Sequence, residues 1–165
     1  MSVTLQEPPN TLEQRFRGAA QAVRLMDHRT PEAMELLHEH HASENTHDIL
    51  RNTATYAEHS RMVFNGEAFD GLDAIEKAHT AVGFGNDGTF SDIALNVFAY
   101  HQSQDAITIE FGIDAKHSGV FGDIQPTGRR VQFPAVGIYT FDVGGKLVQE
   151  NITFDSGAIA RQLTA

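Results

Sequence analysis

The second half of the chain contains four stretches with strand character, and the shortness of their connections limits the fold more than any other feature. These stretches are residues 91–100, 106–117, 129–141 and 146–155. The segments Gln102 to Asp105 and Val143 to Gly145 are too short for a crossover helix, which a parallel pair of strands would need. Neighbouring strands in this half are therefore expected to pair antiparallel.

The first half of the chain has helical patterns instead. Apolar residues recur every three or four positions in three segments, residues 12–26, 31–44 and 72–82. A short helical turn is expected over residues 48–52, and the Asn-Gly pair at residues 65–66 predicts a hairpin turn. Helices followed by strands indicate an α+β fold, in which one curved antiparallel sheet carries the helices on one face.

Composition and charge narrow the class of protein. The 165 residues include no cysteine, and 41% are hydrophobic, as in a single globular domain. We expect residues 1–10 to be a flexible N-terminus and residues 11–165 to form the domain. The formal net charge of -10 disfavours binding to nucleic acid or to an anionic membrane. No export signal and no run of about 18 apolar residues is present, so we expect a cytoplasmic protein.

Two polar residues occupy strand faces that are otherwise apolar. His117 ends the alternating apolar series of residues 107–117, and Glu150 shares its face with Ile152 and Phe154. Burial disfavours the charged form of such groups, which makes them candidates for acid-base chemistry. We expect His117 and Glu150 to face a common cavity and to titrate as a pair. The alternative is that each makes a structural hydrogen bond.

A group of histidine and acidic residues in and after the second helix suggests a metal site at first. Its members are His38, His40, His41, Glu44, His47 and Asp48. Only His40 and Glu44 have the spacing of four that places two ligands on one helix face. No His-Glu-x-x-His motif is present, and neither is a phosphate-binding glycine loop or a serine-nucleophile motif. We therefore expect no metal ion and no cofactor.

Several short motifs in the C-terminal half together resemble a known family. The motifs are Lys116-His117-Ser118-Gly119, Pro126-Thr127-Gly128-Arg129, Phe154-Asp155 and Arg161-Gln162-Leu163. Over residues 31–164 the chain is similar to the SnoaL-like polyketide cyclases, which belong to the nuclear transport factor 2-like superfamily. The resemblance implies a cone-shaped, cystatin-like α+β barrel, whose curved sheet wraps around a helix and a deep apolar pocket. It also implies a homodimer formed through the sheet.

The resemblance implies several reactions, because the family includes polyketide cyclases, ketosteroid isomerases, dehydratases and epoxide hydrolases, besides members without known catalysis. The position of the acidic base of the cyclases falls on Ile152, which cannot abstract a proton. Acid-base work in this chain must then come from His117, Glu150 or His59.

The hypothesis from sequence is a cofactor-independent enzyme that moves a proton next to the carbonyl group of an apolar small molecule, as an isomerase, dehydratase or cyclase does. Glu150 or His117 would be the base, and His59 would hydrogen-bond the substrate oxygen. The expected substrate-binding residues are Tyr56, Tyr100, Phe133 and Tyr139. The alternative is a non-catalytic module of the same fold that binds a small ligand or a protein.

One strand is apolar on both of its faces, and this favours a homodimer. Its apolar residues are Phe133, Val136, Ile138 and Phe141. Only one face can meet the helices, so the other face is expected to meet a second copy of the chain.

Overall fold

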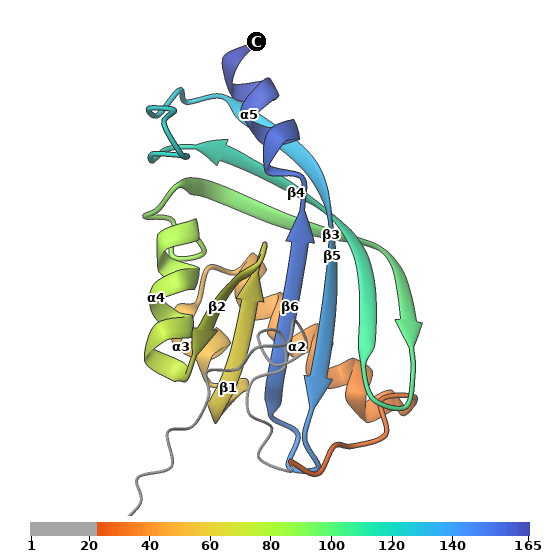
Figure 1. Cartoon of the computed structure of the whole chain (residues 1–165). Coiled ribbons are helices and arrows are strands. Elements are labelled where there is room, and N and C mark those ends of the chain that lie inside the picture. Colours follow the sequence, from red (N-terminus) through yellow and green to blue (C-terminus); the bar gives the residue numbers. More distant parts are fainter. Residues whose placement is uncertain (1–22) are drawn as a thin grey trace, which may run out of the picture.

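The computed structural model describes residues 23–165 of the chain. Their elements, in chain order, are α2 (Pro31–Asn45), α3 (Ile49–Thr53), β1 (Tyr56–Phe64), β2 (Glu67–Asp70), α4 (Leu72–Val82), β3 (Phe90–Gln102), β4 (Ile107–His117), β5 (Arg130–Phe141), β6 (Leu147–Phe154) and α5 (Ser156–Thr164). Figure 1 shows the curved sheet with its helices. The α+β class expected from the sequence is confirmed.

Most of the helix expected over residues 12–26 lies outside the described residues, as does the proposed boundary at residue 10. The last four residues of that segment are described, and they are not helical. Leu25 forms an isolated antiparallel bridge with Asp142, and the backbone N–H of Met26 donates to the carbonyl oxygen of Phe141. This part of the prediction was wrong because the backbone groups pair with the end of β5.

The strands of the described region form one sheet in the order β2-β1-β6-β5-β4-β3. The expected antiparallel pairing of the four long strands is confirmed. The expectation of an entirely antiparallel sheet was wrong, because β1 pairs with β6 in parallel. Four strands and a helix separate β1 from β6 in the chain, so no short loop forces them to be antiparallel. The sheet is an open, curved one whose edges are β2 and β3, and it does not close into a barrel.

The helix ends follow from local side-chain chemistry. Thr30 accepts a hydrogen bond from the backbone N–H of Ala33 at the start of α2, and Asp48 caps α3 in the same way. Sequence analysis assigned no element after residue 155, yet Asp155 caps α5. Side-chain oxygens at these positions satisfy backbone N–H groups that have no partner inside the helix.

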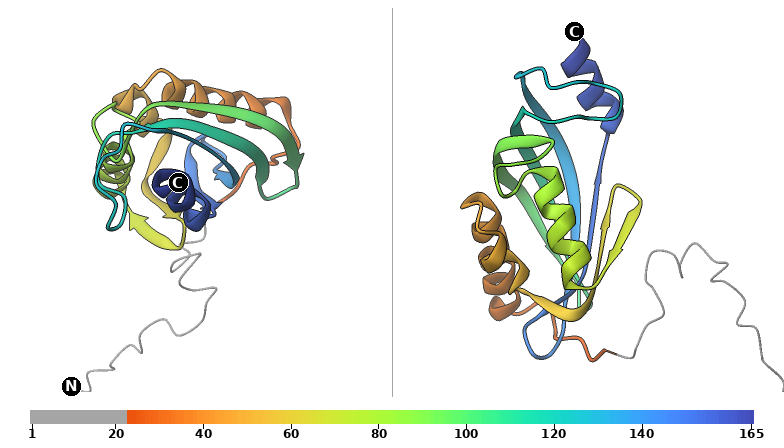
Figure 2. Two further views of the ribbon diagram at one scale, coloured as in Figure 1. Left: turned by 90° about the horizontal axis from the view of Figure 1, so that it is seen from above. Right: turned by 90° about the vertical axis from the view of Figure 1, so that its left-hand side faces the viewer.

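The main helices pack so that polar side chains of α2 are buried against the sheet. His40, His41 and Glu44 are all buried, and the two histidine rings lie against Tyr139 of β5. From α4, His79 is buried and its ring approaches Tyr56 of β1. Figure 2 shows α2 and α4 from two directions. No helix within residues 23–165 combines the length and the apolar character needed to cross a membrane.

The two faces of β5 differ as expected from the sequence. Phe133 and Phe141 are buried, whereas Val136 and Ile138 are 42% and 39% exposed. Phe98 of β3 is 68% exposed, and its ring covers Gly112 of β4, where a Cβ atom would lie 2.7 Å from the ring. The outer face of the sheet therefore carries an exposed apolar patch, made of Phe98, Val136 and Ile138.

Gly83 ends α4 and fixes its distance from β3. Its φ is +123°, and a Cβ atom there would lie 1.8 Å from the backbone oxygen of Phe90. Gly66 also has a positive φ, +93°, but has open space around it. We predict that Gly66→Ala lowers the free energy of unfolding by about 1 kcal/mol, and that Gly83→Ala lowers it by at least about 2 kcal/mol more. Urea denaturation measures both, and equal losses would contradict the close contact.

Candidate functional site

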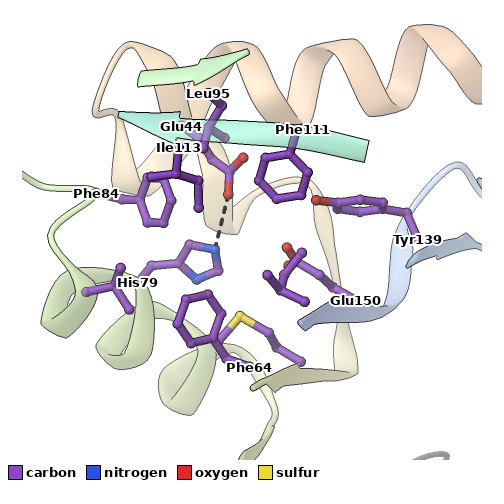
Figure 3. A pocket seen from close by; sticks show the side chains of 12 residues that line it. Glu44, Phe64, His79, Phe84, Leu95, Phe111, Ile113, Tyr139 and Glu150 are labelled. Atoms are coloured by element: carbon purple, nitrogen blue, oxygen red, sulfur yellow. Dashed lines mark ion pairs between the residues drawn. The ribbon is translucent and has the colours of Figure 1, made fainter. Parts of the chain in front are cut away.

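Four ionisable side chains meet in the interior between α2, α4 and the sheet. His40 and Glu44 come from α2, His79 from α4 and Glu150 from β6. Each is at most 4% exposed, and one nitrogen or oxygen atom from each lies within 4.8 Å of the others. We call these four residues the buried cluster. Figure 3 shows Glu44, His79 and Glu150 directed toward a common centre.

The contacts inside the buried cluster are close but longer than hydrogen bonds. The Nε2 atom of His40 lies 3.7 Å from Oε1 of Glu44 and 3.8 Å from Oε2 of Glu150. The Nε2 atom of His79 lies 3.7 Å from the same Oε1 of Glu44, a contact drawn as a dashed line in Figure 3. Two carboxylates thus alternate with two imidazoles, an arrangement that compensates buried charge.

The other ring nitrogen of each cluster histidine has its own partner. Nδ1 of His79 lies 2.9 Å from the carbonyl oxygen of Ile75, one turn earlier in α4. Nδ1 of His40 lies 2.9 Å from the hydroxyl of Thr55, which itself donates to the carbonyl oxygen of Asn52. Both Nδ1–H groups therefore donate outward, and both Nε2 atoms point into the cluster.

Two tyrosines extend the polar network toward β1 and β5. The hydroxyl of Tyr56 donates to Oε2 of Glu150. The hydroxyl of Tyr139 lies 3.1 Å from Nε2 of His41, and Tyr139 is the β5 neighbour of Glu150 in the sheet. Both phenols are buried, so they are hydrogen-bonding groups held in fixed positions.

Burial and charge shift the pKa values of these groups in opposite directions. Burial alone would raise the pKa of Glu150, but contact with His40 and the charge of His79 lower it to about 2. Burial lowers the pKa of His40 and of His79, yet the nearby glutamates outweigh this effect and both pKa values are raised. Burial lowers the pKa of His41 to about 4. Burial, together with the charge of Glu150, raises the pKa values of Tyr56 and Tyr139.

Two adjoining cavities lie beside the buried cluster. The smaller has a volume of about 20 Å³ and is lined by Glu44, His79 and Glu150 together with Tyr139 and apolar side chains. A cavity of this volume has room for about one water molecule. The larger has a volume of about 610 Å³ and an almost entirely apolar lining, which suits a small organic ligand. Four side chains line both cavities, namely Phe64, Val82, Phe84 and Ile113.

Three of the residues expected from sequence meet at this site. Glu150 and Tyr139 line the smaller cavity, and Tyr56 binds Glu150. Phe133 lines the larger cavity. Ile152, at the position of the cyclase base, lines the smaller cavity without a polar atom.

The structure does not bring His117 and Glu150 together. Glu150 of β6 pairs with Tyr139 of β5, and Tyr139 pairs in turn with Ile107 of β4. Glu150 therefore lies across β5 from the start of β4. His117 ends β4, ten residues later, which is roughly 30 Å along the strand. Its Nδ1 lies 3.1 Å from the hydroxyl of Thr127. The expectation of one coupled pair was wrong because alternation fixes the face of a strand and not the position along it.

Two further candidates lie away from both cavities. His59 of β1 is exposed. Tyr100 is 43% exposed, and its ring contacts that of His38 on α2.

His79 was not among the site residues expected from the sequence, and neither was the link between the pair His40 and Glu44 and Glu150. The signals were nevertheless present. His79 shares the apolar face of α4 with Ile75, and His40 and Glu44 share a face of α2. A histidine on an apolar helix face and a glutamate on an apolar strand face each need a buried partner, and here they supply one another.

Comparisons with known proteins agree on the fold. The family model described as SnoaL-like polyketide cyclase matches residues 43–163. A putative SnoaL-like polyketide cyclase from Jannaschia sp. CCS1 has a similar structure, with a TM-score of 0.71 and 18% identity over 83% of this chain and 96% of that one. AclR, a putative hydroxylase from Streptomyces galilaeus, has a TM-score of 0.67 and 22% identity over 81% of this chain and 96% of that one.

A third similar structure is SalBIII, described as an epoxide hydrolase/cyclase-like enzyme in pyran ring formation in the polyether salinomycin. Its TM-score is 0.62, with 13% identity over 74% of this chain and 89% of that one. Among curated proteins, no significant sequence match to the chain was found.

The shifted pKa values predict how stability depends on pH. The raised pKa of His79 contributes stability below its ordinary value of 6.5, and this contribution is lost as pH rises through the folded-state pKa. The lowered pKa of Glu150 contributes stability above 4.5, and this is lost as pH falls toward about 2. Urea denaturation in the presence of a chelator should therefore show the largest contribution of these two groups between pH 4.5 and 6.5.

Substitution separates the two sides of this profile. His79→Gln should flatten the decline above pH 6.5, and Glu150→Gln should flatten the decline on the acid side. His101→Gln is the control, because this exposed histidine pairs only with the exposed Glu110. An alkaline decline that is unchanged in His79→Gln would show that His79 is not held in its charged form by the cluster.

Proposed function

Because the chain belongs to the SnoaL-like polyketide cyclase family, we propose that it is an enzyme acting on an apolar, oxygen-bearing small molecule. The proposed reaction is proton transfer next to a carbonyl group, as catalysed by an isomerase, a dehydratase or a cyclase. Two proteins of similar structure are a putative hydroxylase and an epoxide hydrolase/cyclase-like enzyme, and this supports an enzymatic role.

The observation that carries this proposal is the position of Glu150. Its carboxylate is buried, hydrogen-bonded to Tyr56 and part of the lining of the smaller cavity. The larger apolar cavity adjoins that site. A substrate whose apolar body fills the larger cavity can extend a carbonyl group past Phe84 and Ile113 toward Glu150. An apolar surrounding then strengthens the interaction between the carboxylate and the reacting C–H group.

Each polar group has a proposed role in the reaction. Glu150 accepts the proton from the carbon next to the carbonyl, and Tyr139 donates a hydrogen bond to the carbonyl oxygen as negative charge develops there. His79, held by Glu44, gives a proton to the product. The proton on Glu150 then passes through His40 and Glu44 to His79, so that both groups regain their starting states. The phenols suit hydrogen-bond donation because burial raises their pKa values and keeps them protonated. These steps use the side chains of the chain itself.

A binding protein without catalysis is the second candidate. The four side chains shared by the two cavities stand between the apolar space and the carboxylates. A ligand can therefore fill the larger cavity without touching Glu150, and the outcome of the exchange experiment below distinguishes this case.

We also propose that the protein forms a homodimer through the outer face of its sheet. The exposed apolar side chains of this face are Phe98 on β3 and Val136 and Ile138 on β5, and apolar surface of this kind favours association. We predict that Val136→Asp shifts the protein from dimer to monomer in light scattering. Leu50→Asp, which changes a 76% exposed leucine on α3, should leave the dimer intact. A monomeric parent protein would contradict the proposal.

The catalytic proposal predicts proton exchange at carbon. Bound 2-tetralone, a bicyclic ketone, should exchange its acidic C–H protons for deuterium in D₂O, as followed by NMR. Glu150→Gln should lower the exchange rate about 10² to 10⁴-fold, because the amide has nearly the same shape and cannot accept the proton. Glu58→Gln changes an exposed glutamate on β1 and serves as the matched control.

Binding measured on the same samples separates catalysis from stability. Glu150→Gln should still bind the ketone, as detected by line broadening, and thermal denaturation reports whether the variant is folded. Saturable binding of ketone without exchange in the parent protein would contradict the enzyme and favour the binding protein.

A further inference from the structure

The spacing within the buried cluster is unusual for an ion-pair network. Its closest contacts are 3.7 Å and 3.8 Å, which exceed the length of a hydrogen bond. Buried carboxylates and imidazoles that pair with each other directly come within about 2.7–2.9 Å. An atom or ion bound at the centre of the cluster, between these side chains, would account for the longer separations.

Two buried atoms of the cluster side chains have no hydrogen-bond partner among residues 23–165. They are Nε2 of His40, which faces the cluster, and Oε2 of Glu44, on side chains that are 0% and 4% exposed. A buried polar atom without a partner costs about 1–3 kcal/mol. Oε2 of Glu44 has lone pairs, and Nε2 of His40 exposes one when it releases its proton, so a cation would satisfy both atoms.

The hydrogen bonds outside the cluster prepare both histidines to act as metal ligands. Each Nδ1–H donates outward, His79 to the carbonyl oxygen of Ile75 and His40 to the hydroxyl of Thr55. This pattern fixes the ring and leaves the Nε2 lone pair directed inward, as it is in metal-binding histidines.

Size and charge agree with a divalent ion. The four ligand atoms lie within 4.8 Å of one another, and tetrahedral bonds of about 2.0–2.2 Å place ligand atoms about 3.3–3.6 Å apart. The contacts of 3.7 Å and 3.8 Å need to shorten by a few tenths of an ångström, and the widest pair needs to shorten by about 1 Å. The two carboxylates balance a charge of +2, and the adjoining cavity of about 20 Å³ has room for one further ligand, such as water.

We propose that His40, Glu44, His79 and Glu150 form a binding site for a divalent first-row transition-metal ion of the zinc type. Two imidazole nitrogens with two carboxylate oxygens suit zinc, cobalt or iron, whereas calcium and magnesium prefer oxygen ligands alone. Sequence analysis expected no metal because it recognised only the pair His40 and Glu44, and folding adds His79 and Glu150.

This inference goes beyond the proposed function, which needs only side chains. In the metal-free protein Glu150 is free to act as a base. In the metal-loaded protein it is a ligand, and the ion itself would polarise a substrate oxygen. Binding of metal and exchange of protons are therefore measured separately, and either can fail without the other.

The test starts from full-length protein freed of metal by a chelator. After incubation with Zn²⁺ and gel filtration, we expect elemental analysis to find about one zinc ion per chain and thermal denaturation to show a higher midpoint. Co²⁺ should give the visible absorption of a site with nitrogen and oxygen ligands. Ca²⁺ at the same concentration should leave the melting midpoint unchanged.

Variants assign the ion to the cluster. Glu44→Gln and His79→Gln should each lose the bound zinc, and Thr55→Val, which removes the hydroxyl partner of His40, should weaken zinc binding about 10- to 100-fold. His101→Gln removes an exposed histidine that pairs with Glu110, and it should retain the zinc. Circular dichroism confirms that each variant is folded.

Three outcomes would overturn the proposal. They are no retained zinc in folded parent protein, retained zinc that is unchanged in both Glu44→Gln and His79→Gln, and zinc that is lost in His101→Gln. If zinc is not retained but 2-tetralone still exchanges, the proposed function stands without a metal. If zinc is retained by the cluster and no exchange occurs, the metal site stands and the proposed reaction does not.

Discussion

The buried carboxylate of Glu150 is the constraint on which the arrangement of the helices depends. A charge in the interior is tolerated only where other groups compensate it. Tyr56, His40 and His79 do so from β1, α2 and α4, and Glu44 balances the second imidazole. Because these partners come from three separate elements, the charge on β6 specifies where both helices must lie. A wholly apolar sheet face would accept the helices in several packing positions. The face that carries Glu150 favours one position, in which the polar partners meet the carboxylate.

The sequence predicted the faces of the elements better than their positions. Alternation along β6 placed Glu150 inside, and the spacing of four placed His40 and Glu44 on one side of α2, both as observed. Alternation also placed His117 inside, where it is buried. Its distance from Glu150 depends on the pairing register of β4, β5 and β6, which alternation does not contain. The packing of α4 beside β1, which brings in His79, was not predictable for the same reason, since no local pattern encodes it.

The architecture separates two requirements that a site for an apolar substrate must satisfy. The larger cavity offers mainly apolar area, with Glu67, Lys77 and Thr89 as the polar members of its lining, and the smaller one offers polar groups with almost no volume. Phe64, Val82, Phe84 and Ile113 belong to the lining of both cavities. Selectivity for the shape of a ligand and reactivity toward it can therefore change independently through different residues.

The parallel pairing of β1 with β6 has a consequence for how the molecule assembles during synthesis. Tyr56 lies beside Leu147 in the sheet, so the strand that completes the centre of the sheet is synthesised after β2, α4, β3, β4 and β5. Contacts between such distant segments form slowly. Until β6 inserts between β1 and β5, Glu150 is not in place, and the buried cluster consists only of the side chains from α2 and α4. A nascent chain in which β6 is not yet in place therefore exposes the polar side chains of its interior, which chaperones and proteases can recognise.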